Sequence, residues 1–152
     1  MDLYFAYGSN MNFKQMALRC PGAKLGGKAY LPGWSYFINE NGYAGIEQRA
    51  GAKVLGGLWH LQTKHWLELD RYEDIDHGFY EKVRIAVISE KNTALQELEV
   101  WVYLSCNYKY GTPSAEYHEI VMEGASDLQL SPDYVKTLEK WAEGHNLNRN
   151  KG

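Results

Sequence analysis

Four acidic residues crowd one short segment of the sequence, LDRYEDIDHGFY, at positions 69–80. They are Asp70, Glu73, Asp74 and Asp76. The preceding pattern predicts a helix over about 64–73, with Thr63 as its N-terminal cap. The carboxylates therefore lie at the C-terminal end of a helix, which carries partial negative charge and is stabilised by cations. Such a placement favours the protonated form of any carboxylate that is also buried.

Glu73 is the carboxylate that we expect to be buried. Trp66, Leu69 and Glu73 lie at i, i+3 and i+7, so they share one helix face, whereas Asp74 should turn toward solvent. Burial, neighbouring carboxylates and the helix end would together raise the pKa of Glu73, which makes it a candidate general acid/base. A solvated acidic helix end with one half-buried glutamate bonded to a backbone amide would give the same pattern. An EF-hand is not indicated, because Ile75 stands where its glycine should be.

The second segment whose residue types could take part in binding or catalysis is YGSN, at positions 7–10. Gly8 permits a tight bend, and the N–H groups of Gly8 and Ser9 could point into a cleft as an anion-binding nest. This nest could hold a substrate carboxylate or the oxyanion of an attacked carbonyl. A plain strand-to-helix turn capped by Ser9 or Asn10 would look the same in sequence. The segment matches neither a dinucleotide fingerprint nor a phosphate loop, so nucleotide binding is not indicated.

The elements that would position these residues follow from hydrophobic periodicity and turn residues. Strands are predicted at 3–7, 28–31, 34–39, 43–47, 54–61, 80–88 and 95–104, and further helices at 13–20, 113–123 and 132–143. Asn41-Gly42 favours a hairpin turn, and the last two strands are expected to pair across 89–94. Thr112-Pro113 and Ser131-Pro132 are typical of helix starts.

The order of these elements predicts one α+β domain. Strands dominate the first two thirds and helices the end, which is typical of a mostly antiparallel or mixed sheet that can close into a small barrel. We expect this domain to span 1–144, followed by a polar tail over 145–152.

Composition narrows the class of protein further. The net charge of −3 and the absence of a basic run argue against nucleic acid and anionic membrane as partners. No apolar run approaches the roughly 20 residues that span a bilayer, and the N-terminus lacks a signal-peptide pattern, so a cytoplasmic location is expected. The two cysteines form no Cys-x-x-Cys pair and the five histidines show no zinc-binding spacing, so no metal site is predicted. Oligomeric state is left open.

Taken together, the motifs resemble the γ-glutamyl cyclotransferase-like family. The resemblance runs from residue 3 to about residue 138 through YFAYGSNM, GGLWHL, LDRYED, GFY and YLSCNYKYGTPSAEY, in this order. It implies an α+β domain with a small, mixed, barrel-like β-sheet, flanking helices and one cavity. It also implies a cofactor-independent reaction in which the α-amine of a γ-glutamyl compound attacks its own γ-carbonyl, releasing 5-oxoproline and a free amine.

The resemblance also assigns roles to residues. Glu73 matches the catalytic acid/base. The γ-glutamyl group would be gripped by Tyr4, Phe5, Ala6, Tyr7, Gly8 and Ser9, with Asn10 completing the loop and with Tyr80 and Tyr117 in the pocket. Asp74-Ile75 stands where many relatives carry Gly-Val, and the 34–46 segment is shorter than in enzymes acting on γ-glutamyl amino acids.

The sequence does not identify the amine that is released from the γ-glutamyl group. It also leaves two alternatives to catalysis: a binding module that senses a γ-glutamyl or other small carboxylated metabolite, and a surface for protein partners, which no amphipathic run supports.

Overall fold

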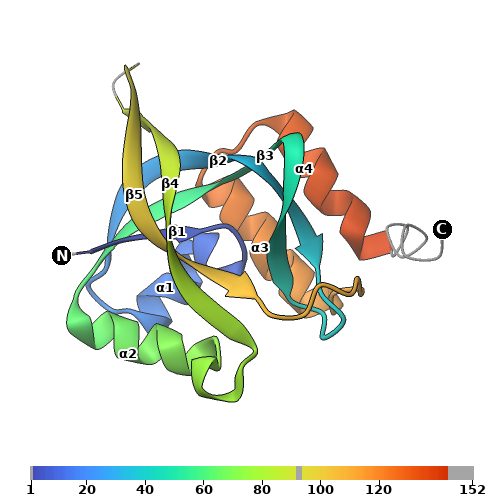
Figure 1. The fold of residues 1–152 in the computed structure, drawn as a ribbon, viewed down its shortest axis with the longest axis horizontal. Coiled ribbons are helices and arrows are strands. Elements are labelled where there is room, and N and C mark those ends of the chain that lie inside the picture. The colour runs from blue at the N-terminus through green and yellow to red at the C-terminus, as the bar shows by residue number, and fades with distance from the viewer. Residues whose placement is uncertain (1, 92–93, 144–152) are drawn as a thin grey trace.

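The computed structural model describes residues 2–91 and 94–143. Its five strands close into a barrel in the order β1-β3-β2-β4-β5 (Figure 1). The strands are β1 (Asp2–Ala6), β2 (Lys24–Ile38), β3 (Ala44–Leu61), β4 (Tyr80–Lys91) and β5 (Ala94–Ser105). The helices are α1 (Phe13–Arg19), α2 (Thr63–Tyr72), α3 (Ala115–Asp127) and α4 (Pro132–Glu139), with 3₁₀ turns at Ser9–Met11, Ile75–His77 and Lys140–Glu143.

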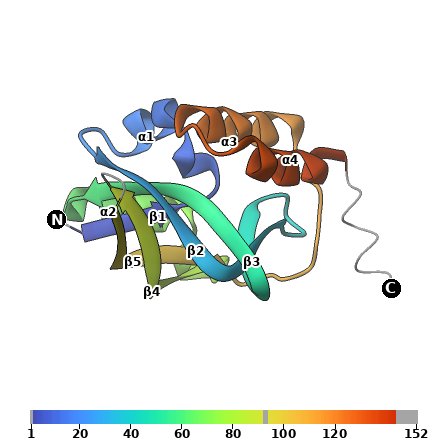
Figure 2. The same ribbon diagram turned by 90° about the horizontal axis from the view of Figure 1, so that it is seen from above.

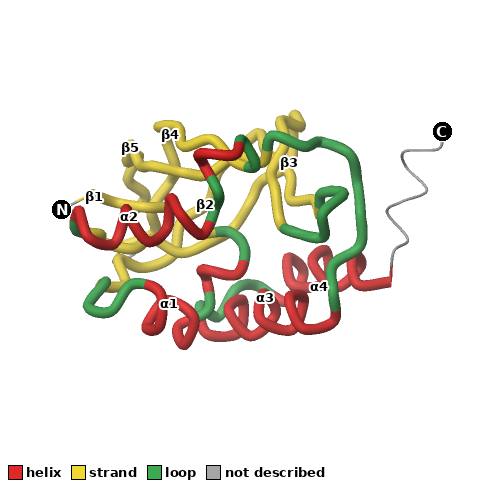
Figure 3. Tube along the Cα trace, turned by 90° about the horizontal axis from the view of Figure 1, so that it is seen from below, coloured by secondary structure: helices red, strands yellow, loops and turns green. Residues whose placement is uncertain are grey.

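The barrel is a mixed sheet. Neighbouring strands pair antiparallel except β1 and β5, which run parallel and meet at Tyr4 and Trp101. Helices α1, α3 and α4 lie together on one side of the barrel (Figures 2 and 3). The predicted α+β class with a small barrel-like sheet is therefore confirmed.

Two long strands replace four short predicted ones. The structure joins 28–31 with 34–39 into β2, and 43–47 with 54–61 into β3. The sequence prediction was wrong because Pro32-Gly33 bends β2 at a register shift instead of ending it. Gly33 has a φ of 82° and Gly51 a φ of 83°, a backbone conformation that glycine adopts without steric cost.

Both predicted hairpins are present. Residues 39–43 connect β2 to β3, with the Gly42 N–H donating to Asn39 O at 2.9 Å and a Gly42 φ of 90°. Strands β4 and β5 pair from Tyr80 and Ser105 to Lys91 and Ala94. Positions 92–93 at the tip of this second hairpin lie outside the described residues, as does the predicted tail at 145–152.

Helix boundaries follow the capping side chains. Helix α3 begins at Ala115 and not at the predicted Pro113, because the Ser114 hydroxyl accepts the Tyr117 N–H at 3.1 Å. Helix α4 begins at Pro132 as predicted, after Ser131. Helix α2 begins after Gln62, which forms a reciprocal cap with His65, so the predicted Thr63 cap is wrong.

Helix α3 fixes the position of the turn at Ser9–Met11. Gly124 of α3 is so close to this turn that a Cβ atom there would lie 2.7 Å from the Asn12 backbone nitrogen. The Asn12 amide also donates to Ile120 O at 3.0 Å. The loop that leaves β1 is therefore held between the barrel and α3. Within the described part of the chain, no helix is long and apolar enough to cross a membrane.

Candidate active site

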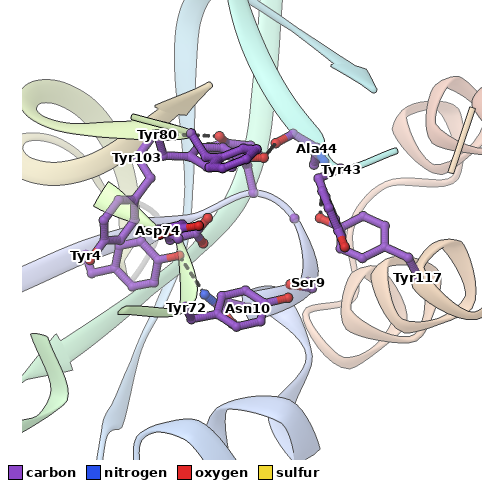
Figure 4. Close-up of a pocket in the computed structure, with 14 residues that line it drawn as sticks. Tyr4, Ser9, Asn10, Tyr43, Ala44, Tyr72, Asp74, Tyr80, Tyr103 and Tyr117 are labelled. Atoms are coloured by element: carbon purple, nitrogen blue, oxygen red, sulfur yellow. Dashed lines mark hydrogen bonds between the residues drawn. The ribbon is translucent and has the colours of Figure 1, made fainter. Parts of the chain in front are cut away.

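A cavity of about 290 Å³ opens where the end of β1, the C-terminal end of α2 and the first residues of β3 and β4 meet (Figure 4). Tyrosine side chains make up much of its wall. The lining residues are Tyr4, Tyr7, Gly8, Ser9, Asn10, Tyr43, Ala44, Tyr72, Glu73, Asp74, Phe79, Tyr80, Tyr103 and Tyr117. The cavity therefore joins the two segments that the sequence marks as chemically unusual.

Most of the predicted site residues meet in this cavity. Those that line it are Glu73, Tyr4, Tyr7, Gly8, Ser9, Asn10, Tyr80 and Tyr117. Phe5 and Ala6 do not line it, because both side chains are completely buried in the core. A Cβ atom at Gly56 would lie 2.9 Å from the Phe5 ring and 2.2 Å from Ala6 O, so β1 packs directly on β3 here. These two residues hold the strand and contribute no surface to the cavity.

Glu73 immediately follows α2 and is half-buried. Its N–H donates to Leu69 O at 2.8 Å, which fixes it to the last turn of the helix. Burial raises the pKa of Glu73 from 4.5 to about 7, and the nearby Arg19 guanidinium opposes part of this rise. The carboxyl group is therefore present in both protonation states near neutral pH.

The other acidic residues of this segment do not face Glu73 as a cluster. Asp70 accepts two hydrogen bonds from Lys82 Nζ, at 3.0 and 3.1 Å. Asp74 is bonded to His77, and Asp76 is exposed. The raised pKa of Glu73 thus comes from burial, and the expected contribution of neighbouring carboxylates is not what produces it.

The backbone after Glu73 reverses direction through a left-handed residue. Asp74 has a φ of 55°, and its N–H donates to Arg71 O at 3.1 Å. Glycine takes this conformation most readily, and Asp or Asn can follow. This explains why Asp74 can stand where the family resemblance expects glycine. The reversal also brings Asp74 to the cavity wall, where the sequence pattern expected it to face solvent.

Three tyrosine hydroxyls of the cavity donate to fixed acceptors. Tyr7 donates to Tyr103 O, Tyr80 to Ala44 O, and Tyr103 to Asp70 Oδ1, each at 2.6 Å. Burial raises the pKa of all three, and the Glu73 carboxylate adds to the rise. These rings therefore remain neutral and give the cavity a rigid wall.

Two other hydroxyls accept hydrogen bonds. Tyr4 Oη accepts from Asn10 Nδ2 at 3.0 Å, and Tyr117 Oη accepts from the Ala44 N–H at 3.2 Å. Burial raises the pKa of both, so both keep their protons. Since each oxygen is held as an acceptor, its own O–H is oriented by the protein. Such groups can donate to an oxygen of a bound molecule.

Arg19 is a site residue that the sequence did not indicate. Its Nη1 donates to Ser9 Oγ at 3.2 Å and to Asn10 Oδ1, and its Cζ lies 3.5 Å from the centroid of the Tyr72 ring. One cation thus holds the Ser9–Asn10 loop and one aromatic wall. The contact with Tyr72 joins α1 to α2, and no local pattern in the sequence predicts it.

The sequence also did not single out as site residues Tyr43, Ala44, Tyr72, Asp74, Phe79 and Tyr103, which line the cavity. Among residues 2–91 and 94–143, no three His, Cys, Asp or Glu side chains are placed to share one metal ion. Cys20 and Cys106 are both free, and Cys20 is buried away from the cavity lining.

Comparison with known proteins identifies relatives of this chain. The sequence model of the AIG2-like family matches residues 53–138. γ-Glutamylcyclotransferase of Homo sapiens is 29% identical over 147 residues, which cover 90% of this chain and 77% of the relative. The Mus musculus protein of the same name is equally similar, with the same coverage.

Solved structures agree with these sequence matches. A structure described as γ-glutamyl cyclotransferase superposes with a TM-score of 0.83 at 28% identity, covering 91% of this chain and 86% of that one. A Homo sapiens protein described as uncharacterized superposes with a TM-score of 0.81 at 30% identity and the same coverage. The chain belongs to the AIG2-like family and has the fold of γ-glutamyl cyclotransferases.

Proposed function

We propose that the protein is a cofactor-independent γ-glutamyl cyclotransferase in which Glu73 acts first as general base and then as general acid. The α-amine nitrogen of the substrate forms a bond to its γ-carbon, and the bond between the γ-carbon and the amide nitrogen breaks. The proton taken from the α-amine ends on the departing amine. 5-Oxoproline and a free amine are the products, and no oxidant or other reactant is consumed.

The observation that carries this proposal is the placement of Glu73. A carboxyl group with a pKa of about 7 in a cavity can accept a proton and return it at neutral pH. At this pH the substrate α-amine is mostly an ammonium ion, which cannot attack a carbonyl until a base removes a proton. A site for binding alone does not require a half-buried acid with this property.

The Gly8–Asn10 loop would orient the γ-glutamyl group. The turn starting at Ser9 has its first hydrogen bond from Met11 N to Gly8 O, at 3.0 Å, so the N–H groups of Ser9 and Asn10 have no acceptor within the turn. With Arg19 behind Ser9 and Asn10, this wall has positive potential. We assign it to the substrate α-carboxylate.

The hydroxyls of Tyr4 and Tyr117 would then face the γ-carbonyl. Tyr4 is buried and Tyr117 is partly buried; both hydroxyls are neutral and held as acceptors, and Glu73 is close enough to each to raise its pKa. They can donate to the oxyanion that forms when the α-amine attacks. Because the reaction is intramolecular, folding the substrate into an attack-ready conformation contributes up to about 7 to 11 kcal/mol, and the rigid tyrosine wall supports that task.

The alternative is a binding module that uses the same cavity for a γ-glutamyl metabolite without turnover. The test is to incubate the protein with γ-glutamyl amines and γ-glutamyl amino acids, and to quantify 5-oxoproline and free amine by mass spectrometry. Calorimetric titration of the same compounds runs in parallel. Equal amounts of the two products, dependent on enzyme, support the cyclotransferase. Tight binding of a compound, with no product from any of them, would establish the binding module instead.

A further inference from the structure

The charged groups of the cavity are distributed unevenly. Of the described residues that line it, two are carboxylic acids, Glu73 and Asp74, and none is Lys, Arg or His. The cation against the wall is Arg19, and its hydrogen bonds go to Ser9 and Asn10. Fixed positive charge at the cavity therefore lies behind the loop that we assign to the substrate's own α-carboxylate.

Another nearby cation is already neutralised. Lys82 Nζ lies 3.0 and 3.1 Å from the two carboxylate oxygens of Asp70 and 4.6 Å from the centroid of the Trp66 ring. Lys82 does not line the cavity, and Tyr103, which donates to Asp70, stands on the cavity side of this pair. This ammonium group is therefore not available to a second carboxylate of a ligand.

The rim of the cavity is aromatic and acidic. Tyr43, Tyr72 and Phe79 line the cavity although these residues are 48%, 42% and 48% exposed, so they stand where the cavity meets solvent. Tyr43 packs edge-on against Tyr117, with the ring centroids 5.2 Å apart, and Tyr72 is held by Arg19 on one face. These rings present a fixed apolar surface to the part of a substrate that extends out of the cavity.

Asp74 adds negative charge to the same rim. It follows Glu73 directly and lines the cavity, and its carboxylate is bonded to the exposed His77 imidazole. A leaving group that carries a carboxylate would meet the Asp74 carboxylate, and like charges at close range repel when His77 is neutral and does not offset the charge of Asp74. An uncharged or cationic leaving group would instead find aromatic faces and a carboxylate, which attract it.

On this arrangement, and resting on the cyclotransferase reaction proposed above, we infer that the leaving group is an amine without a carboxylate. The preferred substrates are then γ-glutamyl amines with an apolar or cationic body, and γ-glutamyl amino acids are poor substrates. Tyr43, Tyr72, Asp74 and Phe79 form the leaving-amine subsite.

Three compounds of matched size test this inference: γ-glutamyl-phenethylamine, γ-glutamyl-phenylalanine and γ-glutamyl-phenylalanine amide. The first lacks the carboxylate, and the third replaces it with a neutral carboxamide. Release of 5-oxoproline is measured at pH 8.5, because the hydrogen bond to Asp74 raises the pKa of His77 and an alkaline pH reduces the positive charge on its imidazole. We expect kcat/KM for both neutral compounds to exceed that for the amino acid by about tenfold or more, because only the amino acid places a second carboxylate beside Asp74 at the rim of the cavity.

Variants separate charge from shape. Asp74→Asn keeps a residue that tolerates the left-handed backbone, and it should reduce the preference for neutral compounds by roughly three- to tenfold. Phe79→Arg supplies the missing cation and should raise activity on the amino acid. Asp76→Asn removes an exposed carboxylate that does not line the cavity, and it should leave the preference unchanged.

The outcomes are distinguishable. Equal or reversed kcat/KM values, a carboxamide as poor as the amino acid, or a preference unaffected by both Asp74→Asn and Phe79→Arg would overturn the inference while the cyclotransferase activity stands. If no compound yields 5-oxoproline although all three bind, the proposed reaction itself is wrong.

Discussion

The raised pKa of Glu73 should make the stability of the protein depend on pH, and Glu73→Gln should remove that dependence. The folded state binds the Glu73 proton more tightly than the unfolded chain, where the pKa is 4.5, because the folded value is about 7. The contribution to stability is therefore fully present below pH 4.5 and is lost as the pH rises toward 7. Glutamine resembles the protonated side chain at every pH, so the variant does not pay this penalty.

The size of the effect follows from the two pKa values. The rise from 4.5 to about 7 corresponds to a cost of about 3 kcal/mol for ionising Glu73 in the folded protein. We expect Glu73→Gln to be more stable than the wild type by about 1 kcal/mol at pH 5 and about 3 kcal/mol at pH 8.

Urea denaturation at pH 5, 6, 7 and 8, followed by the fluorescence of the five tryptophans, measures these free energies of unfolding. Glu68→Gln is the matched control, because Glu68 lies on the same helix with an exposed side chain in a surface ion pair with Arg71. Its difference from the wild type should change by less than about 0.5 kcal/mol over this range. If the Glu73→Gln difference were equally independent of pH, Glu73 would ionise like a surface carboxylate and the reasoning would be refuted.

Two further variants test how the site is held. Arg19→Met removes the cation that lowers the pKa of Glu73, so the acidic limb of the pH–rate profile, which reports ionisation of the general base, should move to higher pH. At pH 7, kcat/KM should then fall by roughly tenfold, whereas Arg19→Lys should retain a profile closer to that of the wild type. An unmoved profile in the methionine variant would show that Arg19 does not act on Glu73. Gly8→Ala places a Cβ atom 3.0 Å from Ala44 Cβ and 3.3 Å from Tyr117 Oη, so the loop or Tyr117 must shift at a cost of about 1 to 3 kcal/mol. The result should be a raised KM with a similar circular dichroism spectrum, and an unchanged KM would mean that the loop does not contact the substrate.

Local patterns in the sequence were sufficient for most of the elements. Alternation in β4 and β5 and the Asn41-Gly42 turn reflect interactions between near neighbours, and the structure confirms them. The Pro32-Gly33 break was misread because a proline at a register shift and a proline at a strand end look alike until the partner strand is known.

The candidate site was predictable where one element carries the signal. Glu73 and the Gly8–Asn10 loop stand out because carboxylates at a helix C-terminus and a glycine after a strand are locally unusual. Arg19 and Tyr103 could not be found this way, because their contacts join elements that are distant in the sequence. Arg19 in α1 contacts Tyr72 in α2, and Tyr103 in β5 donates to Asp70 in α2. Phe5 and Ala6 were included because the motif is continuous in sequence, although only part of it faces the cavity.

The central claim is that Glu73 moves the proton in 5-oxoproline formation. The most direct test is the turnover of Glu73→Gln, measured by 5-oxoproline release from the best γ-glutamyl amine, together with the dissociation constant of that compound from calorimetry. We predict that kcat falls by about 10²-fold or more while the dissociation constant changes by no more than about threefold, because glutamine preserves the shape of the cavity but cannot accept a proton. Turnover close to that of the wild type, with binding intact, would contradict the role of Glu73 and the mechanism built on it.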